Sequence, residues 1–535
     1  MGAPSQAPNT GAGVPVAPNK WLVTAAISLG TLMGTIDISI VNVALPHVQA
    51  TFGVAVTEAA WTTTAYLIAL VVILPLAGWL GAAFGRKRVY QIGLGVFTGA
   101  SFLAGVAPSL PVLIAARALQ GLGAGVLGPM EQSILRETFP PKQQGLATGL
   151  YGMVLLVGPT IGPLLGGWIT DNYAWRWIFF INLPVGLLAS TMVALIIREG
   201  PRARTQLAGF DFVGIGLMAA GLSSLVVVLE QGNRWDWFDS PLVWGLTLVA
   251  GSSLLLFVFW ELVGTETPAV DLRIIGGRTF AAAWVSIGIV GFGQFSGLVL
   301  ISLFLQQALD YTALQTGLQF FPRGLVSMAM SPIGGIVAGL VGPRFVVGPG
   351  LVLAGASMVL MSRWTLGAGA PQILLPMAVL GFAFPLMVVP LIASGLNAVE
   401  RRKVIGAAGL MNLMSAGWVV WDRGDHNDAR AWHNVVSRTS RRAGEARPSG
   451  VGGSHASGDG VDDARGKRGH RGSAAGSGHP RPRHHRAGGR PLVRAAFQII
   501  ALLYFGALLA IRFFPGRPAA GCSLGAGRFL RSSLA

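Results

Sequence analysis

Long apolar runs follow one another along most of the chain, and short polar segments separate them. Each run approaches the ~20 residues that a helix needs to cross a bilayer. Together they predict an all-α integral membrane protein of about fourteen transmembrane helices. The runs lie at 22–44, 60–83, 89–107, 112–135, 145–168, 178–197, 211–230, 242–262, 280–305, 317–341, 345–365 and 372–396, with a possible thirteenth at 404–421 and a last one at 496–513.

An internal repeat divides this series. Segments 75–93 and 332–350 resemble each other at a constant offset of 257 residues. At this offset Pro75 aligns with Pro332, Gly78 with Gly335 and Gly85 with Gly342. Parallel repeats are typical of secondary transporters, in which two similar bundles enclose a site near the middle of the membrane. We expect an arm at 1–20, a six-helix bundle at 21–200, two inserted linker helices at 201–265, a partial second bundle at 266–421, a basic segment at 422–494, a last helix at 495–515 and a tail at 516–535.

Composition agrees with a membrane protein and excludes several functions. The chain is 52% hydrophobic and 11% charged, whereas soluble proteins carry about 25% charged residues. Its single cysteine, Cys522, excludes an internal disulfide or a cysteine metal site. The sequence has no glycine-rich Lys-Ser/Thr loop for nucleotide phosphates. We therefore expect no metal or cofactor and no enzymatic activity. The arm has no charge before Lys20, unlike a cleaved signal.

Charge sets the expected orientation. Lysine and arginine gather in the loops after even-numbered runs, as at Arg86–Arg88, Lys142 and Arg401–Lys403. Such loops face the cytoplasm, so we expect a multi-pass protein of the plasma (inner) membrane with a cytoplasmic N-terminus. The net charge of +17 would suggest nucleic acid, but segment 422–494 holds 15 Lys and Arg against 7 Asp and Glu. Because the excess is concentrated there, we expect no nucleic-acid partner, and a monomer in the lipid bilayer.

Asp37, Arg117 and Glu131 are ionisable side chains inside predicted spans. A charge there costs ~2.5–3.5 kcal/mol or more, so it must face the bundle interior or water. Asp37 is either a proton or cation site or a structural hydrogen-bonding group. Arg117 needs an acidic partner, for which Asp37 and Glu131 are available. Arg117 and Glu131 are also candidates for proton coupling, although Glu131 lies one turn before a basic loop and could instead sit at the head-group level.

Other polar and small residues suggest a cavity and a hinge. Asn42 accompanies Asp37, Gln120 follows Arg117, and Arg323 lies about two turns into its helix. Arg323 could meet an anionic group in a cavity or snorkel outward. The stretch "GPTIGPLLGG" (158–167) packs two Gly-Pro pairs and a Gly-Gly into one helix, which favours close packing or bending.

Five motifs in order carry a family resemblance: "IDISIVNVALP", "GWLGAAFGRKR", "RALQGLGAG", "GPTIGPLLGG" and "WRWIFFINLPVG". Together they resemble the fourteen-helix drug:proton antiporters of the major facilitator superfamily, over roughly residues 20–414 and the last helix. The resemblance implies proton-coupling roles for Asp37 and Arg117. It assigns to the antiporter motif Gly158, Pro159, Gly162, Pro163, Gly166 and Gly167.

The resemblance also implies a cytoplasmic gate loop containing Gly78, Gly85, Arg86 and Arg88. The family usually has an acidic residue four positions after the first glycine, where this chain has Ala82. A charge lock at this gate would therefore be weaker or made differently.

These observations favour a secondary transporter that exports small amphipathic compounds in exchange for protons. One alternative is an exporter of a defined metabolite, such as an antibiotic, a siderophore or an amino acid. Another is a transport-impaired or sensory remnant of such a protein.

The stretch "WVVWDRGDHNDARAWH" (418–433) interrupts the thirteenth run with charge. It could begin a disordered basic loop, a basic nucleic-acid- or lipid-binding insert, or a segment translated in the wrong frame. Between Asp422 and Pro491 the chain has no Leu, Ile, Phe, Met or Tyr, and it holds seven of the eight histidines.

The genetic code allows a test of the third possibility. Asp425–Asp428 must be encoded GAY-CAY-AAY-GAY, and one base later these codons can encode only Ile, Thr or Met. The TGG codons of Trp418, Trp421 and Trp432 shift to glycine codons. A one-base indel near codon 415, compensated near 490–495, would restore a glycine-rich apolar helix. We therefore expect the thirteenth helix to be truncated or absent and 422–494 to be disordered, and the coding DNA can decide.

Overall fold

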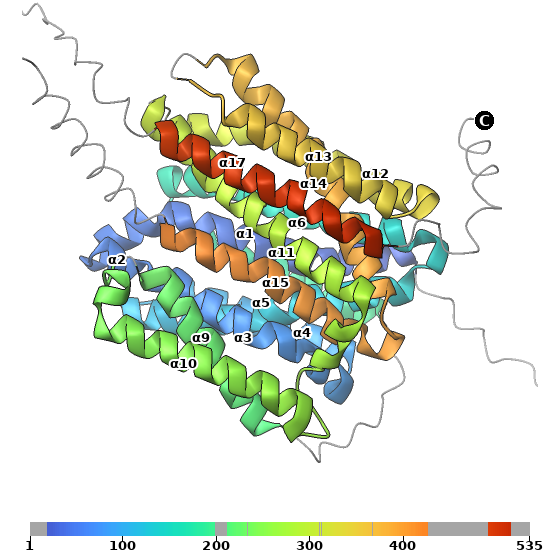
Figure 1. The fold of residues 1–535 in the computed structure, drawn as a ribbon. Helices are drawn as coiled ribbons and strands as arrows, with labels where there is room; N and C mark the ends of the chain where they lie inside the picture. Colours follow the sequence, from blue (N-terminus) through green and yellow to red (C-terminus); the bar gives the residue numbers. More distant parts are fainter. Residues whose placement is uncertain are drawn as a thin grey trace, which may run out of the picture.

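A computed structural model describes residues 19–197, 211–232, 234–309, 311, 313–365, 368–425 and 490–514. Within these residues all regular structure is helical (Figure 1). Twelve helices there are long and apolar enough to cross a membrane, which confirms the all-α membrane class. Helices α4 and α15 are similarly long but more polar, at 20 and 22 residues. The count of fourteen spans stays a prediction.

The helices fall into an N-terminal set, a linker pair and a C-terminal set. The N-terminal set is α1 (Lys20–Phe52), α2 (Val56–Ala59), α3 (Trp61–Phe84), α4 (Arg86–Gly105), α5 (Leu110–Thr138), α6 (Gln144–Asn172), α7 (Trp177–Phe180) and α8 (Asn182–Ile196). The linker pair is α9 (Phe212–Gln231) and α10 (Pro241–Phe259). The C-terminal set is α11 (Arg278–Leu303), α12 (Ala313–Val341), α13 (Arg344–Met361), α14 (Ala370–Asn397), α15 (Val404–Asp425) and α17 (Arg490–Ala507).

The sequence repeat appears in the backbone. Helix α3 ends at Phe84 and α12 ends at Val341, again 257 residues apart. The next residue in the first copy, Gly85, has φ = 88°, and its counterpart Gly342 has φ = 98°. A side chain is strained at such angles, so both turns require glycine. The two copies therefore share one backbone design at this helix–turn–helix.

The linker helices lie on the outside of the molecule. Helix α9 packs against α10, α3 and α15, and Figure 1 shows α9 and α10 along one edge, opposite α12 and α13. The pair thus widens the structure on one side, where α9 contacts one helix of each set, α3 and α15.

Close backbone contacts join the two sets along two seams. Helix α3 packs against α15, and α6 packs against α12. A Cβ added to Gly78 would lie 2.7 Å from Cα of Gly406, and one added to Gly145 would overlap the backbone of Gly335. Small residues allow this approach, and larger side chains at Gly78, Gly145 or Gly335 would separate the helices.

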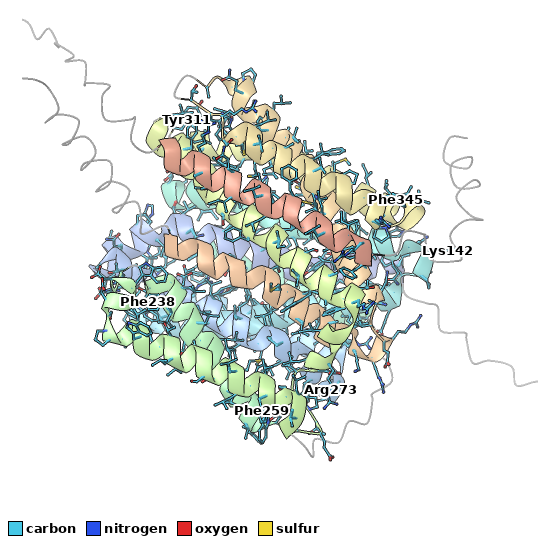
Figure 2. The ribbon with its side chains drawn as sticks, in the orientation of Figure 1. Lys142, Phe238, Phe259, Arg273, Tyr311 and Phe345 are labelled. Atoms are coloured by element: carbon cyan, nitrogen blue, oxygen red, sulfur yellow. The ribbon has the colours of Figure 1, made fainter. Side chains whose placement is uncertain are left out.

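One end of the bundle carries the basic loops and is here called the basic face. Figure 2 shows Lys142 and Arg273 at this end, with Phe238 and Tyr311 at the opposite end. Lys403 pairs with Asp271 at 2.6 Å there.

Hydrogen bonds join the two sets near this face. Ser331 donates to the carbonyl of Gly149 at 2.8 Å, and Arg136 donates to the carbonyl of Leu396. The helices on the basic-face side of the molecule are therefore held together.

The truncation of the thirteenth span stays a prediction. Helix α15 runs for 22 residues from Val404 to Asp425, but it is not among the twelve helices that are long and apolar enough to cross a membrane. The charges from Asp422 onward end the apolar run, but they do not break a backbone helix because their helix propensities are ordinary. Residues 426–489, on which most of the expected disorder falls, lie outside the described residues.

Candidate functional site

A buried ion pair lies at the centre of the N-terminal set. Asp37, near the middle of α1, meets Arg117 of α5 with 2.5 Å between Oδ2 and Nη1. Their side chains are 0% and 1% exposed. Of the two acids considered from the sequence, Asp37 is thus the one in contact with Arg117. A buried pair of this kind is strongly destabilised when one partner is removed, because the other is left as an uncompensated charge.

Amide side chains complete the coordination of Asp37. Gln120 accepts a hydrogen bond from Arg117 at 2.9 Å and donates to Asp37 Oδ1 at 3.4 Å. Asn182 of α8 donates to the same oxygen at 3.3 Å. Both amides also donate to Ser101 Oγ of α4, at 2.5 and 3.0 Å. We call Asp37, Arg117, Gln120, Asn182 and Ser101 the N-terminal cluster; it joins four helices.

The opposite side of Arg117 faces helix α3. Its guanidinium carbon lies 4.3 Å from the ring centroid of Tyr66, and its Nε donates to the carbonyl of Thr62 at 3.3 Å. Stacking on an aromatic face stabilises a desolvated cation. Arg117 is therefore held between a carboxylate on one side and a ring on the other.

Glu131 occupies a separate site on α5. It lies 14 residues beyond Arg117, roughly 20 Å along the helix. It accepts hydrogen bonds from Ser28 at 3.0 Å and from Thr31, both on α1, and it is 0% exposed. The structure therefore places Glu131 inside the bundle, away from Arg117.

The glycines of the antiporter motif press α6 against α1. Gly158, Gly162 and Gly166 face α1, where an added Cβ would overlap Thr35, Ser39 and Ile40 respectively. Ser39 also donates to the carbonyl of Gly158 at 2.9 Å. Pro163 is exposed, and Gly167 has open space beside it; the side chain of Pro159 lies outside the described residues. The contact therefore flanks Asp37 within α1.

The gate-loop residues have distinct positions. Gly78 lies in the α3–α15 seam and Gly85 forms the positive-φ turn. Arg86 forms an ion pair with Glu137 at the end of α5, and Arg88 is exposed. The chain has Ala82 where an acidic residue is usual, and its gate loop instead forms an ion pair with helix α5 through Arg86 and Glu137.

The three residues expected to line a cavity lie in different parts of the structure. Gln120 belongs to the N-terminal cluster. Asn42 is exposed on α1, and its amide donates to the carbonyl of Ile38 at 3.4 Å. Arg323 of α12 is 4% exposed and donates to Gln294 of α11. It therefore points into the C-terminal set and does not snorkel outward.

Sequence reasoning missed Ser101, Asn182 and Gln294. Asn182 lies within "WRWIFFINLPVG", but its polarity was not singled out. Gln294 stands 257 residues after Asp37, so the repeat offset could have identified it. Ser101 carries no signal in a helix rich in small residues.

Comparison with known proteins agrees with this architecture. The profile of the Major Facilitator Superfamily matches residues 27–420. Multidrug export protein EmrB of Escherichia coli K12 is 36% identical over 312 residues, covering 58% of this chain and 60% of that protein. Fatty acid resistance protein FarB of Neisseria gonorrhoeae is 37% identical over 328 residues, covering 61% and 64%. The chain thus matches somewhat over half the length of these relatives.

Solved structures share the fold at low sequence identity. The human organic anion transporter MFSD10 superposes with a TM-score of 0.60 and 16% identity, covering 92% of this chain and 100% of that one. The proton:xylose symporter XylE gives a TM-score of 0.54 and 14% identity, covering 92% and 94%. With the profile matching most of its length and this helical architecture, the chain belongs to the Major Facilitator Superfamily.

Proposed function

We propose that this protein exports small amphipathic or drug-like compounds in exchange for protons. The observation that carries the proposal is the buried Asp37–Arg117 pair, 2.5 Å apart, beside the α1–α6 glycine contact. An ionisable group inside a span is a site for ion coupling, with its partner at hand. The relatives named for multidrug export and fatty acid resistance support the same class of activity.

In the proposed cycle, a proton on Asp37 would weaken its bond to Arg117. The guanidinium would then bind more strongly to Gln120 and the Thr62 carbonyl, which it already contacts. Helix α1 would be freer to shift against α6 along the glycine contact. The two helix sets would rock about the seams at Gly78 and Gly335, as alternating access requires.

The finer features follow from the same proposal. The basic face would lie in the cytoplasm, with the N-terminus on that side of a plasma (inner) membrane. Arg86 and Arg88, with Gly78 and Gly85, would form the gate there. Glu131 would be a second proton carrier, supported by its burial among hydroxyl donors. The protein would act as a monomer without a nucleic-acid partner.

Proton release from vesicles tests the coupling. In inverted vesicles with an imposed proton gradient, adding an amphipathic substrate, tested once as a cationic dye and once as an organic acid, should release protons from the parent protein. Asp37→Asn keeps the size of the side chain and removes its titratable group, so proton release should disappear. Asp239→Asn is the matched control, because this exposed acid lies in the α9–α10 connection. Substrate-driven proton release by Asp37→Asn equal to that of the control would refute the coupling role.

The first alternative is an exporter of one defined metabolite. Growth of cells that express the chain, measured against a panel of dyes, antibiotics, siderophores and amino acids, separates the two. Protection against many unrelated compounds supports a multidrug exporter, and protection against a single class supports the alternative.

The second alternative is a transport-impaired remnant. The family match ends at residue 420, close to codon 415, where the frame hypothesis places an indel. A parent protein that releases no protons with any compound would support this alternative. The coding DNA tests its origin, since a stop codon in the shifted frame across 416–490 would exclude the frameshift.

A further inference from the structure

Arg323 is a buried cation whose guanidinium is incompletely bonded. Its side chain is 4% exposed and donates from Nη2 to the amide oxygen of Gln294. Its other terminal nitrogen, Nη1, has no hydrogen-bond partner in the structure. In the part of the chain that the structure describes, no carboxylate contacts it. A buried charge of this kind is costly unless something compensates it.

The sequence repeat relates this site to the N-terminal cluster. At the offset of 257 residues, Gln294 is the counterpart of Asp37, and Arg323 is the counterpart of Tyr66. Helix α14, the counterpart of α5, contains no arginine. The C-terminal site thus also contains a buried arginine, but this arginine lies on α12, the counterpart of α3, and its partner is an amide where the N-terminal cluster has a carboxylate.

A hydroxyl from the last helix borders the same site. Tyr504 of α17 is fully buried, and α17 packs against α11, the helix that carries Gln294. The Tyr504 ring packs against Gly293, the residue before Gln294, so closely that a Cβ at Gly293 would overlap the ring. The Tyr504 hydroxyl has no hydrogen-bond partner. The Tyr504 hydroxyl and Nη1 of Arg323 are thus two buried donors without a hydrogen-bond partner.

A polar stripe on α12 leads to Arg323 from the end opposite the basic face. Thr316, Gln319 and Arg323 follow at helical spacing, and each has a buried polar atom without a partner. The distance from Thr316 to Arg323 is roughly 10 Å along the helix. Buried polar groups are usually paired, so three unpaired ones in a row indicate a route for water or a polar ligand.

We propose that Arg323, Gln294 and Tyr504 bind the carboxylate of an amphipathic organic acid. The planar guanidinium offers the paired donors that match a carboxylate, and the substrate would supply the negative charge that Asp37 supplies in the other half. The hydrocarbon part would lie among the apolar side chains of the bundle. This inference rests on the proposed export function, because it names the compounds exported.

Equilibrium binding tests the inference without requiring transport. The full chain in lipid nanodiscs is titrated with 4-butylbenzoate, 4-butylbenzylamine and 4-butylbenzyl alcohol, and empty nanodiscs correct for partitioning. These probes share a ring and tail and differ in the head group. The benzoate should bind about tenfold or more tightly than the other two, since hydrogen bonds between charged groups are the strong ones. Equal binding of all three, or no specific binding, overturns the inference.

Two variants assign the binding to this site. Arg323→Gln removes the cation and should weaken benzoate binding about tenfold or more. Gln294→Glu keeps Arg323 and adds an internal carboxylate, so it should weaken benzoate binding comparably while favouring folding. Arg363→Gln is the matched control, because Arg363 is exposed at the end of α13. Unchanged benzoate affinity in both site variants overturns the assignment.

The outcomes separate this inference from the proposed function. Benzoate binding that depends on Arg323, without proton-coupled movement, leaves the acid site standing and removes coupled export. If the benzoate is exported in exchange for protons and neither site variant changes this export, the proposed function stands and the acid site at Arg323 is refuted.

Discussion

In the N-terminal half the buried guanidinium of Arg117 meets the carboxylate of Asp37, whereas in the C-terminal half that of Arg323 meets the amide of Gln294. The helices around them belong to a sequence repeat, and the equivalent glycines Gly85 and Gly342 both have positive φ angles. The two halves therefore have the same scaffold and different chemistry.

Under the proposed function, the difference separates two tasks that a coupled exporter has to perform. A closed ion pair can change its bonding when a proton arrives, because the proton competes with the arginine for the carboxylate. An arginine without an acid remains available to an anion from outside the chain. The two halves differ at more than one position: Asp37 corresponds to the amide of Gln294 across the repeat, and the arginine comes from a different helix in each half. In our proposal these differences give the two sites different roles.

Removing each arginine gives the largest expected contrast. Arg117→Gln leaves Asp37 buried and unpaired, so the free energy of unfolding should fall by about 3–5 kcal/mol. Arg323→Gln removes a cation that lacks an acid, so the same measurement should change little or rise. Both are followed by thermal unfolding of purified protein in detergent, without added organic acid. Equal losses for the two variants would mean that both arginines are compensated alike.

Exchanging the acid and the amide sharpens the comparison. Gln294→Glu should raise the free energy of unfolding by about 1.5–3 kcal/mol, the range for hydrogen bonds to charged groups. Asp37→Asn should lower it, because Arg117 loses its carboxylate. Thermal unfolding of the two single variants and the double variant measures both effects, which should add because the sites lie in different halves. Destabilisation by Gln294→Glu would show that Arg323 already has a negative partner.

Removing one hydroxyl from each site gives the smallest contrast. Ser101 accepts from both Gln120 and Asn182, so Ser101→Ala leaves two buried donors unsatisfied and should cost about 1–3 kcal/mol. Tyr504→Phe removes a hydroxyl that has no partner, so stability should stay near that of the parent. The same unfolding measurement applies. A larger loss for Tyr504→Phe than for Ser101→Ala would contradict the assigned bonding.

The sequence predicted the membrane class and much of the N-terminal cluster. Asp37 and Arg117 stood out because charged residues are rare in apolar runs and costly there. Gln120 followed as a neighbour in the same motif. Glu131 was as conspicuous in sequence, yet its place on α5 gives it hydroxyl partners on α1. Residue type therefore identified which side chains need a partner, but not which partner each one has.

By itself the sequence determined the helical runs, the basic loops and the repeat, because these depend on local hydrophobicity and on spacing along the chain. Only the tertiary structure decided the pairings. Asn182 reaches Asp37 across 145 positions, and Arg323 reaches Gln294 across 29. Contacts of this kind arise where helices cross, and the crossing points depend on glycines such as Gly158 and Gly335 that let backbones approach. The rotation and depth of each helix in the bundle therefore select the partners that its polar residues meet.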